Sequence, residues 1–369
     1  MREPLDLDAI RPLPKVALHD HLDGGVRPQT LIDIAAEIGH ELPANGAREL
    51  ADWFFAAADS GSLVRYLETF DHTIAVLQRA EDLRRVAREF VEDQAADGVV
   101  YAEARWAPEQ HLRRGLTPAE AVGAVRDGLR DGMTACAAKG TPVIARQILT
   151  AMRQNDAGLS IAELAVDTRD ALVGGFDIAG PEDGFPPSRL AAAFHHLQRH
   201  NLPYTIHAGE AAGPESIWEA VQLLRADRIG HGVRIVEDLV DDRVAPGSLA
   251  AYVRDRRIVL EVCPTSNLQT GIAGSYAEHP FGLLERLGFA VTVSCDNRLM
   301  SATSLSEELA HLCEAFGYGI ADLHRFTDTA LNAAFLDRAE RERLREVIAA
   351  GYRAPSPYTP GEGPSPRAT

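Results

Sequence analysis

Apolar residues recur along the chain in eight short, compact runs, most of them separated by stretches with helical spacing. In residues 80–97 and 117–139 the apolar positions repeat with a period of 3.6, which predicts amphipathic helices. The eight runs have the length and composition of strands: Val16–Leu22, Val99–Arg105, Pro142–Ile148, Leu172–Ile178, Tyr204–Glu210, Arg228–Gly232, Ile258–Pro264 and Ala290–Asp296. Eight alternating β and α units favour an α/β fold of the closed parallel type, a (β/α)8 TIM barrel, over a doubly wound sheet.

Two regions depart from this alternation. Residues 28–78 are rich in alanine and aromatic residues and are too long for one barrel helix, so they predict a helical cap inserted after the first strand. Further helices are expected from about 304 to 350. The chain from Ala354 onward is rich in Pro, Gly and Ser, which is typical of disorder. We therefore expect one barrel domain over 1–353 and a disordered tail over 354–369.

Composition narrows the classes of partner. The formal net charge is −17 and no basic cluster is present, so nucleic acid and anionic membranes are poor partners. The four cysteines show no CxxC spacing, which argues against a disulfide framework and against a thiolate zinc site. The N-terminus has no charged-then-apolar leader, and no apolar run approaches the ~20 residues of a membrane span. A cytoplasmic location is the expectation.

Residues suited to metal binding and acid–base chemistry stand at the ends of the predicted strands, where barrel enzymes carry their catalytic groups. His19 and His21 are two positions apart, so on a strand their side chains face the same side. Together with His207 and Asp296 they form a set of three imidazoles and one carboxylate, which suits zinc and leaves room for a water molecule. The third and seventh strands offer no candidate ligand.

Seven stretches between residues 16 and 300 are highly specific as a set: Leu18-His-Asp-His-Leu-Asp-Gly24, Tyr101-Ala-Glu-Ala-Arg-Trp-Ala-Pro108, Gly175-Phe-Asp-Ile-Ala-Gly180, Thr205-Ile-His-Ala-Gly-Glu210, Arg228-Ile-Gly-His-Gly232, Leu260-Glu-Val-Cys-Pro264 and Val293-Ser-Cys-Asp-Asn297. In these stretches and in their order, the chain resembles the adenosine deaminases, a family of the metal-dependent amidohydrolase superfamily. The signature of the Cys-ligated zinc deaminases, HxE followed by PCxxC, is absent, so that other deaminase fold is excluded.

The resemblance implies a role for each matching residue. His19, His21, His207 and Asp296 match the ligands of one zinc ion, and Asp296 thereby belongs to the catalytic centre as well. Glu210 matches the acid that protonates purine N1, and His231 the residue that orients or deprotonates the zinc-bound water. The implied substrate contacts are His21, Asp23 at the ribose 5′-hydroxyl, the backbone N–H of Gly180 at purine N3, Asn297 at N7, and Tyr66 and Phe70 at the substrate gate.

Some positions bear on the metal count and on substrate preference. Two-metal barrel hydrolases usually bridge their ions with a modified lysine on the fourth strand, which has none here, so one zinc ion is expected. Asn297 replaces a second aspartate, and its amide can donate to N7 at any pH. Pro181 and Trp218 are further departures from the family pattern, and they affect the fine substrate preference.

The sequence thus predicts hydrolytic deamination of adenosine and 2′-deoxyadenosine, small-molecule purine nucleosides, with release of ammonia. One alternative is a sister deaminase that acts on adenine or on a 5′-modified adenine nucleoside of the aminofutalosine type, using the same metal site. A second is a non-catalytic barrel that binds a ligand or a partner. The complete ligand set and the presence of Glu210 argue against a non-catalytic protein.

Overall fold

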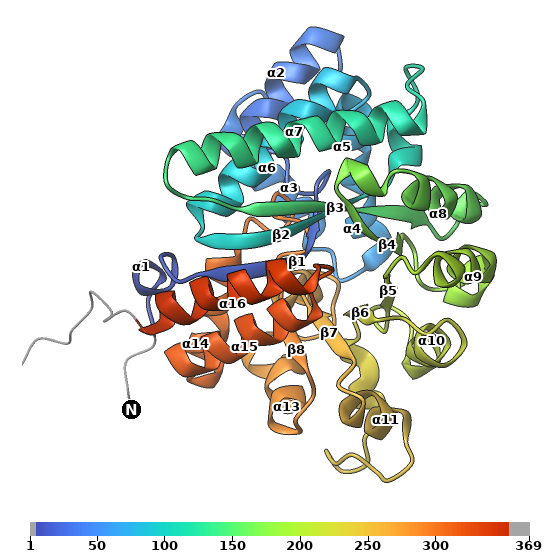
Figure 1. The fold of residues 1–369 in the computed structure, drawn as a ribbon, viewed down its shortest axis with the longest axis vertical. Coiled ribbons are helices and arrows are strands. Elements are labelled where there is room, and N and C mark those ends of the chain that lie inside the picture. Colours follow the sequence, from blue (N-terminus) through green and yellow to red (C-terminus); the bar gives the residue numbers. More distant parts are fainter. Residues whose placement is uncertain (1–4, 354–369) are drawn as a thin grey trace, which may run out of the picture.

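The eight predicted strands form a closed barrel of parallel strands in the computed structural model, which describes residues 5–353 (Figure 1). The strands are β1 (Lys15–His21), β2 (Val99–Trp106), β3 (Ile144–Met152), β4 (Val173–Ala179), β5 (Thr205–Ala208), β6 (Arg228–His231), β7 (Val259–Val262) and β8 (Val291–Val293). They pair in chain order within two halves, β1–β4 and β5–β8. Parallel bridges at Phe176–Tyr204 and Asp20–Asp296 join the halves. The predicted (β/α)8 barrel is confirmed.

Helices surround the barrel. The two predicted amphipathic helices, α6 (Ala80–Ala96) and α7 (Pro118–Ala138), agree with their predicted bounds to within one residue at each end. Thr117 is the N-cap of α7 and forms a capping box with Glu120, and Pro118 occupies the first helical position, which explains where α7 begins. The other outer helices are α1 (Leu7–Ile10), α8 (Gly158–Asp167), α9 (Ala191–His200), α10 (Pro214–Trp218), α11 (Leu249–Asp255), α12 (Pro264–Gln269), α13 (Phe281–Arg286), α14 (Leu305–Phe316), α15 (Ile320–Ala333) and α16 (Arg338–Arg353).

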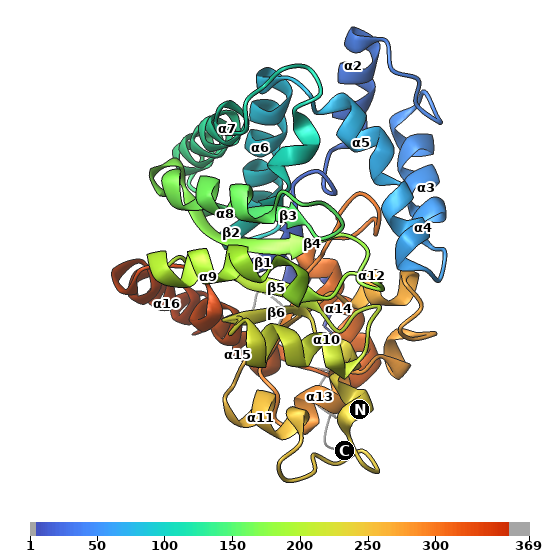
Figure 2. The ribbon, with the colours of Figure 1, turned by 90° about the vertical axis from the view of Figure 1, so that its right-hand side faces the viewer.

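The segment between β1 and α6, predicted as an inserted cap, contains four helices that lie together beside the barrel (Figure 2). They are α2 (Pro28–Ile38), α3 (Ala47–Ala58), α4 (Leu63–Glu68) and α5 (Phe70–Val76). Leu31, Leu50 and Phe54 are fully buried and belong to the main hydrophobic core. Burial of these side chains attaches the insertion to the barrel, so that α4 and α5 take up a fixed position near its mouth.

Several strands differ in length from the predicted runs, and the backbone explains the differences. β5 ends at Ala208 because Gly209 turns the chain with a φ of +76°. β7 ends at Val262 because Pro264 starts α12. β3 continues to Met152, four residues beyond the predicted end, because it stays paired with β4 up to the Met152–Ala179 register. The histidine candidates therefore stand in the last residues of strands β1, β5 and β6, and Glu210 and Asp296 stand on the loops just after β5 and β8.

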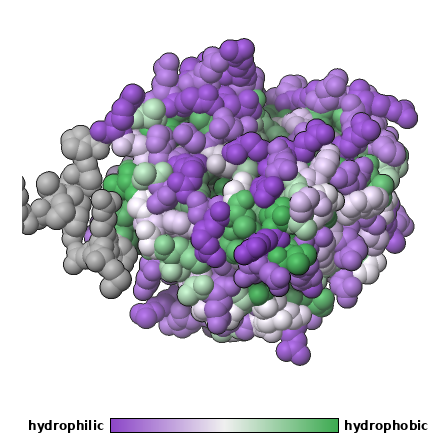
Figure 3. Space-filling view, turned by 90° about the horizontal axis from the view of Figure 1, so that it is seen from below, coloured by the Kyte–Doolittle hydropathy of each residue, from purple (hydrophilic) through white to green (hydrophobic). Residues whose placement is uncertain are grey.

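One face of the molecule is mainly polar. Figure 3 shows this face, on which hydrophilic residues predominate and hydrophobic residues form only small areas, in agreement with a chain of which 25% is charged. Among residues 5–353, none of the helices combines the length and the apolar character needed to cross a bilayer. The tail predicted to be disordered, 354–369, lies outside the described residues.

Candidate active site

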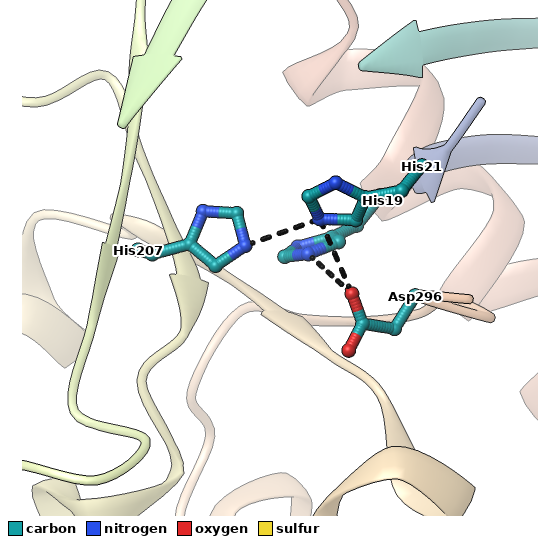
Figure 4. A group of neighbouring side chains, drawn as sticks. All are labelled: His19, His21, His207 and Asp296. Carbon is teal, nitrogen blue, oxygen red and sulfur yellow. Dashed lines mark hydrogen bonds and ion pairs between the residues drawn. The ribbon is translucent and has the colours of Figure 1, made fainter. Parts of the chain in front are cut away.

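The four side chains predicted as metal ligands meet at the C-terminal end of the barrel (Figure 4). His19 and His21 come from β1, His207 from β5, and Asp296 from the loop after β8. His19 Nε2 and His21 Nε2 lie 3.2 and 3.3 Å from Asp296 Oδ1, and His21 Nε2 lies 3.3 Å from His207 Nε2. One ligand atom from each residue falls within 4.8 Å of all the others. The structure thus brings together residues that are far apart in sequence.

The pKa shifts of three of these four residues fit a metal ion. At His19, burial and Arg105 lower the pKa, but the carboxylates of Asp296 and Glu261 raise it on balance. His19 Nε2 is buried and has no hydrogen-bond partner among the described residues, so it is available as a ligand. Burial lowers the pKa of His21 to about 3, which keeps this imidazole neutral. Burial opposes ionisation of Asp296, but the imidazoles around it hold its pKa well below the ordinary value. Neutral imidazoles and an ionised carboxylate are the forms that coordinate zinc.

A second group of possible ligands overlaps the first and is less suitable. His19, His231, Cys263 and Asp296 also offer atoms within 4.8 Å of one another. Burial raises the pKa of the Cys263 thiol well above its ordinary value, so the sulfur stays protonated at neutral pH. A thiol must lose its proton to bind a metal ion, and this favours the group of three histidines and Asp296.

Two buried carboxylates lie against the Nδ1 atoms of two of the predicted ligand histidines. His19 Nδ1 lies 3.1 Å from Glu261 Oε2, and His207 Nδ1 lies 2.9 Å from Asp177 Oδ2. Arg105 joins the two carboxylates, because its guanidinium donates to Asp177 and to Glu261 at 2.8 Å each. The side chains of all five except His207 are fully buried. Such partners orient a histidine so that its Nε2 faces the metal position.

Glu210 and His231 lie beside the ligand set. Glu210 follows β5 and is buried, and its Oε2 is 3.5 Å from His231 Nε2. Burial, and then the negative charges of Asp296 and Glu182, raise the pKa of Glu210 well above its ordinary value. The surroundings therefore favour the protonated form of this carboxyl group. His231 and Asp296 have φ angles of +61° and +60°, an unusual backbone conformation that is often found at functional sites.

A cavity of about 330 Å³ opens next to the ligand set, between the barrel mouth and α4 and α5. Among the predicted substrate contacts, the residues that line it are His21, Asp23, Phe70 and Gly180. Its other charged lining residues are Glu68 and Asp71, and no Lys or Arg of the described chain lines it. The cavity is thus apolar and acidic, which suits a neutral ligand.

Tyr66 and Asn297, also predicted as substrate contacts, do not line this cavity. Both are buried, and Asn297 Nδ2 donates a hydrogen bond of 2.9 Å to the Tyr66 hydroxyl. The structure therefore brings these two residues together with each other.

The comparison with known proteins decides the family. The chain matches the adenosine deaminase family over residues 14–351. It belongs to the adenosine deaminase family. It is 56% identical to an adenosine deaminase of Mycobacterium ulcerans (93% of this chain, 96% of the relative) and 55% identical to adenosine deaminase 1 of Streptomyces coelicolor (94% and 88%). A zinc-bound amidohydrolase structure from Burkholderia ambifaria is similar, with 29% identity, a TM-score of 0.81 and 95% of each chain covered.

Family membership confirms the resemblance seen in the sequence, yet several residues around the site were missed there. Asp177, Glu261 and Arg105 are charged residues within otherwise apolar strands. Charged side chains are almost never fully buried unless they are paired, so this pattern was a usable signal. Glu182 offered a weaker signal, because it stands in a loop between β4 and α9.

In this member of the adenosine deaminase family, the Glu182 side chain forms hydrogen bonds with the loop that carries Glu210. Its carboxylate accepts hydrogen bonds of 2.6–3.0 Å from the backbone N–H groups of residues 209–212. It also accepts one of 2.6 Å from the Ser216 hydroxyl. Backbone N–H groups that are buried without an acceptor cost free energy, so this carboxylate stabilises the turn after β5. Glu182 thereby fixes where Glu210 stands.

We expect Glu182→Gln to lower the free energy of unfolding by about 1–3 kcal/mol for each backbone N–H that loses its acceptor. The amide has one acceptor oxygen and directs an NH₂ group at a cluster of donors. Glu219→Gln is the matched control, because Glu219 Oε2 accepts one backbone N–H, that of Ser188, at 3.0 Å. Urea unfolding measures both variants, and equal stability losses would contradict the role of Glu182.

Proposed function

We propose that this protein catalyses the hydrolytic deamination of adenosine and 2′-deoxyadenosine to inosine and 2′-deoxyinosine, with one zinc ion per subunit as cofactor. One observation carries the proposal. A buried carboxyl group with a raised pKa, Glu210, lies beside three imidazoles and a carboxylate, next to a cavity without cationic side chains among its described lining residues. The names of the two bacterial relatives support adenosine as the substrate.

The reaction requires a nucleophilic water and an acid. The water oxygen bonds to C6 of the purine while N1 takes the proton of Glu210, and one proton of the water then restores the Glu210 carboxyl group. The remaining hydroxyl proton moves to the amino group, the C6–N6 bond breaks to release ammonia, and C6 becomes a carbonyl. Zinc held by His19, His21, His207 and Asp296 would lower the pKa of a coordinated water from 15.7 to about 7. Glu210 supplies the proton to N1, because its raised pKa keeps the carboxyl group protonated. His231, which faces Glu210, orients the water.

Two of the proposed nucleoside contacts, Asp23 and Gly180, line the cavity, and the third, Asn297, lies outside its lining. Asp23 accepts from the ribose 5′-hydroxyl, since its Oδ1 is buried and has no hydrogen-bond partner among the described residues. The N–H of Gly180 donates to purine N3. A side chain at Gly180 is excluded, because its φ is +102° and a Cβ would lie 2.4 Å from Gln154 Oε1. Asn297 donates one amide hydrogen to Tyr66 and keeps the second for purine N7.

AMP is expected to be a poor substrate, with kcat/KM at least about 100-fold below that of adenosine. Two unit charges about 4 Å apart repel by about 4 kcal/mol at an effective dielectric of about 20, and Asp23 would meet the 5′-phosphate. No described Lys or Arg lines the cavity to compensate. Steady-state kinetics with both substrates tests this. Asp23→Asn should bring kcat/KM for AMP closer to that for adenosine. Equal turnover of AMP and adenosine by the native enzyme would contradict the prediction.

A substrate panel on the purified, zinc-loaded protein tests the proposed function. Loss of absorbance near the adenine maximum, with release of ammonia, should be fastest for adenosine and 2′-deoxyadenosine. Faster turnover of adenine, or of an aminofutalosine-type nucleoside, would replace adenosine as the substrate. No turnover of any adenine compound would point to a non-catalytic barrel.

A further inference from the structure

Asn267 joins His231 to a second buried histidine, His279. Asn267 lies on α12, and its amide stands between the two rings. Asn267 Nδ2 is 3.2 Å from His231 Nδ1, and Asn267 Oδ1 is 3.3 Å from His279 Nε2. All three side chains are nearly inaccessible to solvent. Because solvent barely reaches these side chains, neighbouring protein groups determine which nitrogen atoms of the two rings carry hydrogen.

The direction of the hydrogen bonds follows from the far end of the chain. The backbone N–H of Phe281 donates to His279 Nδ1 at 3.0 Å, and a backbone N–H has no alternative to donating. His279 Nδ1 is therefore the acceptor. Burial lowers the pKa of His279 to about 4, so the ring is neutral at pH 7 and carries its single hydrogen on Nε2. That hydrogen is donated to Asn267 Oδ1.

The orientation of the Asn267 amide then determines the state of His231. With Oδ1 turned to His279, the NH₂ group faces His231 Nδ1, and an amide NH₂ only donates. His231 Nδ1 is consequently an acceptor, and the neutral ring carries its hydrogen on Nε2. This nitrogen faces Glu210, whose Oε2 is 3.5 Å away.

We propose that Asn267 and His279 are positioning residues that fix His231 as the tautomer protonated on Nε2. On the proposed function, His231 then acts by donating a hydrogen bond to the reacting water, and it does not remove the proton from that water. Nε2 already holds a hydrogen, and a second hydrogen on Nδ1 would face the NH₂ group of Asn267. Asn267 and His279 act through His231 and do not themselves touch the substrate.

Replacing Asn267 by Asp tests this chain of hydrogen bonds, because a carboxylate accepts from both rings and favours a hydrogen on His231 Nδ1. ¹⁵N NMR of the zinc-loaded enzyme, with histidine ring nitrogens labelled, reads the tautomer directly. We expect Nε2–H in the native enzyme and Nδ1–H in Asn267→Asp. The wrong tautomer lowers kcat by about 10⁴ in Ser-His-Asp enzymes, and here we expect a fall of at least about 100-fold. KM and zinc content should change little.

Two variants of His279 separate the tautomer from the packing of the ring. Glutamine keeps an oxygen to accept from Phe281 and an NH₂ group to donate to Asn267, whereas leucine keeps neither. We expect His279→Gln to retain the hydrogen on His231 Nε2 and a kcat within about tenfold of the native value. We expect His279→Leu to lose this tautomer and to have a kcat more than about tenfold below the native value. Thermal unfolding of both variants shows whether each is folded under the assay conditions.

Two results would overturn this proposal: a native His231 that lacks a hydrogen on Nε2, or an Asn267→Asp enzyme with an unchanged tautomer and kcat. Failure of the proposed function looks different. In that case the native protein does not deaminate adenosine, while its NMR spectrum still shows whether Asn267 and His279 set the tautomer of His231.

Discussion

Glu210→Gln is expected to lower kcat for adenosine by at least about 100-fold, since general acid catalysis typically contributes 10²–10⁴-fold. The amide has nearly the same shape as the carboxyl group but cannot deliver a proton to purine N1. Zinc content should be unchanged, because Glu210 is outside the group of ligand atoms. Steady-state kinetics and metal analysis on the same preparation give both quantities.

The pH dependence and a nearby variant serve as controls for this result. Because the protonated carboxyl group is the active form, kcat should fall as the pH rises through the raised pKa of Glu210. Glu215→Gln removes an exposed carboxylate at the start of α10 and should leave kcat unchanged. A Glu210→Gln enzyme with near-native kcat would show that another group, or the solvent, protonates the purine.

Removal of the metal ion by a chelator is expected to abolish deamination, and added zinc is expected to restore it. Without the ion, a water at the site loses the lowering of its pKa by roughly nine units that zinc provides. The midpoint of thermal unfolding should also fall, because a ligand that binds only the folded state stabilises it. Activity and unfolding are measured on one preparation before chelation, after it and after zinc is returned.

The ligand assignment makes the metal prediction specific. His207→Ala should bind less zinc and lose activity, since it removes one of the four converging groups. His195→Ala changes an exposed histidine on α9 and should retain full zinc content and activity. Full activity in the zinc-free native protein, or a normal zinc content in His207→Ala, would contradict the assigned site.

Much of the fold and the chemistry of the site could be predicted from the chain alone. Strands of a parallel barrel are buried on both faces, so they read as continuous apolar runs, and eight such runs specify the barrel. Catalytic groups of barrels stand at the C-terminal ends of strands. For that reason His19, His21, His207 and Asp296 could be predicted to meet, and the structure brings them together.

Other features depended on the tertiary structure. No spacing rule pairs Asp177 with His207, Glu261 with His19, or Asn267 with His231, because each pair joins different segments of the barrel. The structure also places Tyr66 against Asn297 and away from the cavity lining. A residue's type states which hydrogen bonds it can form. Which of them it forms depends on distances of about 3 Å and on burial, and only the folded chain sets these.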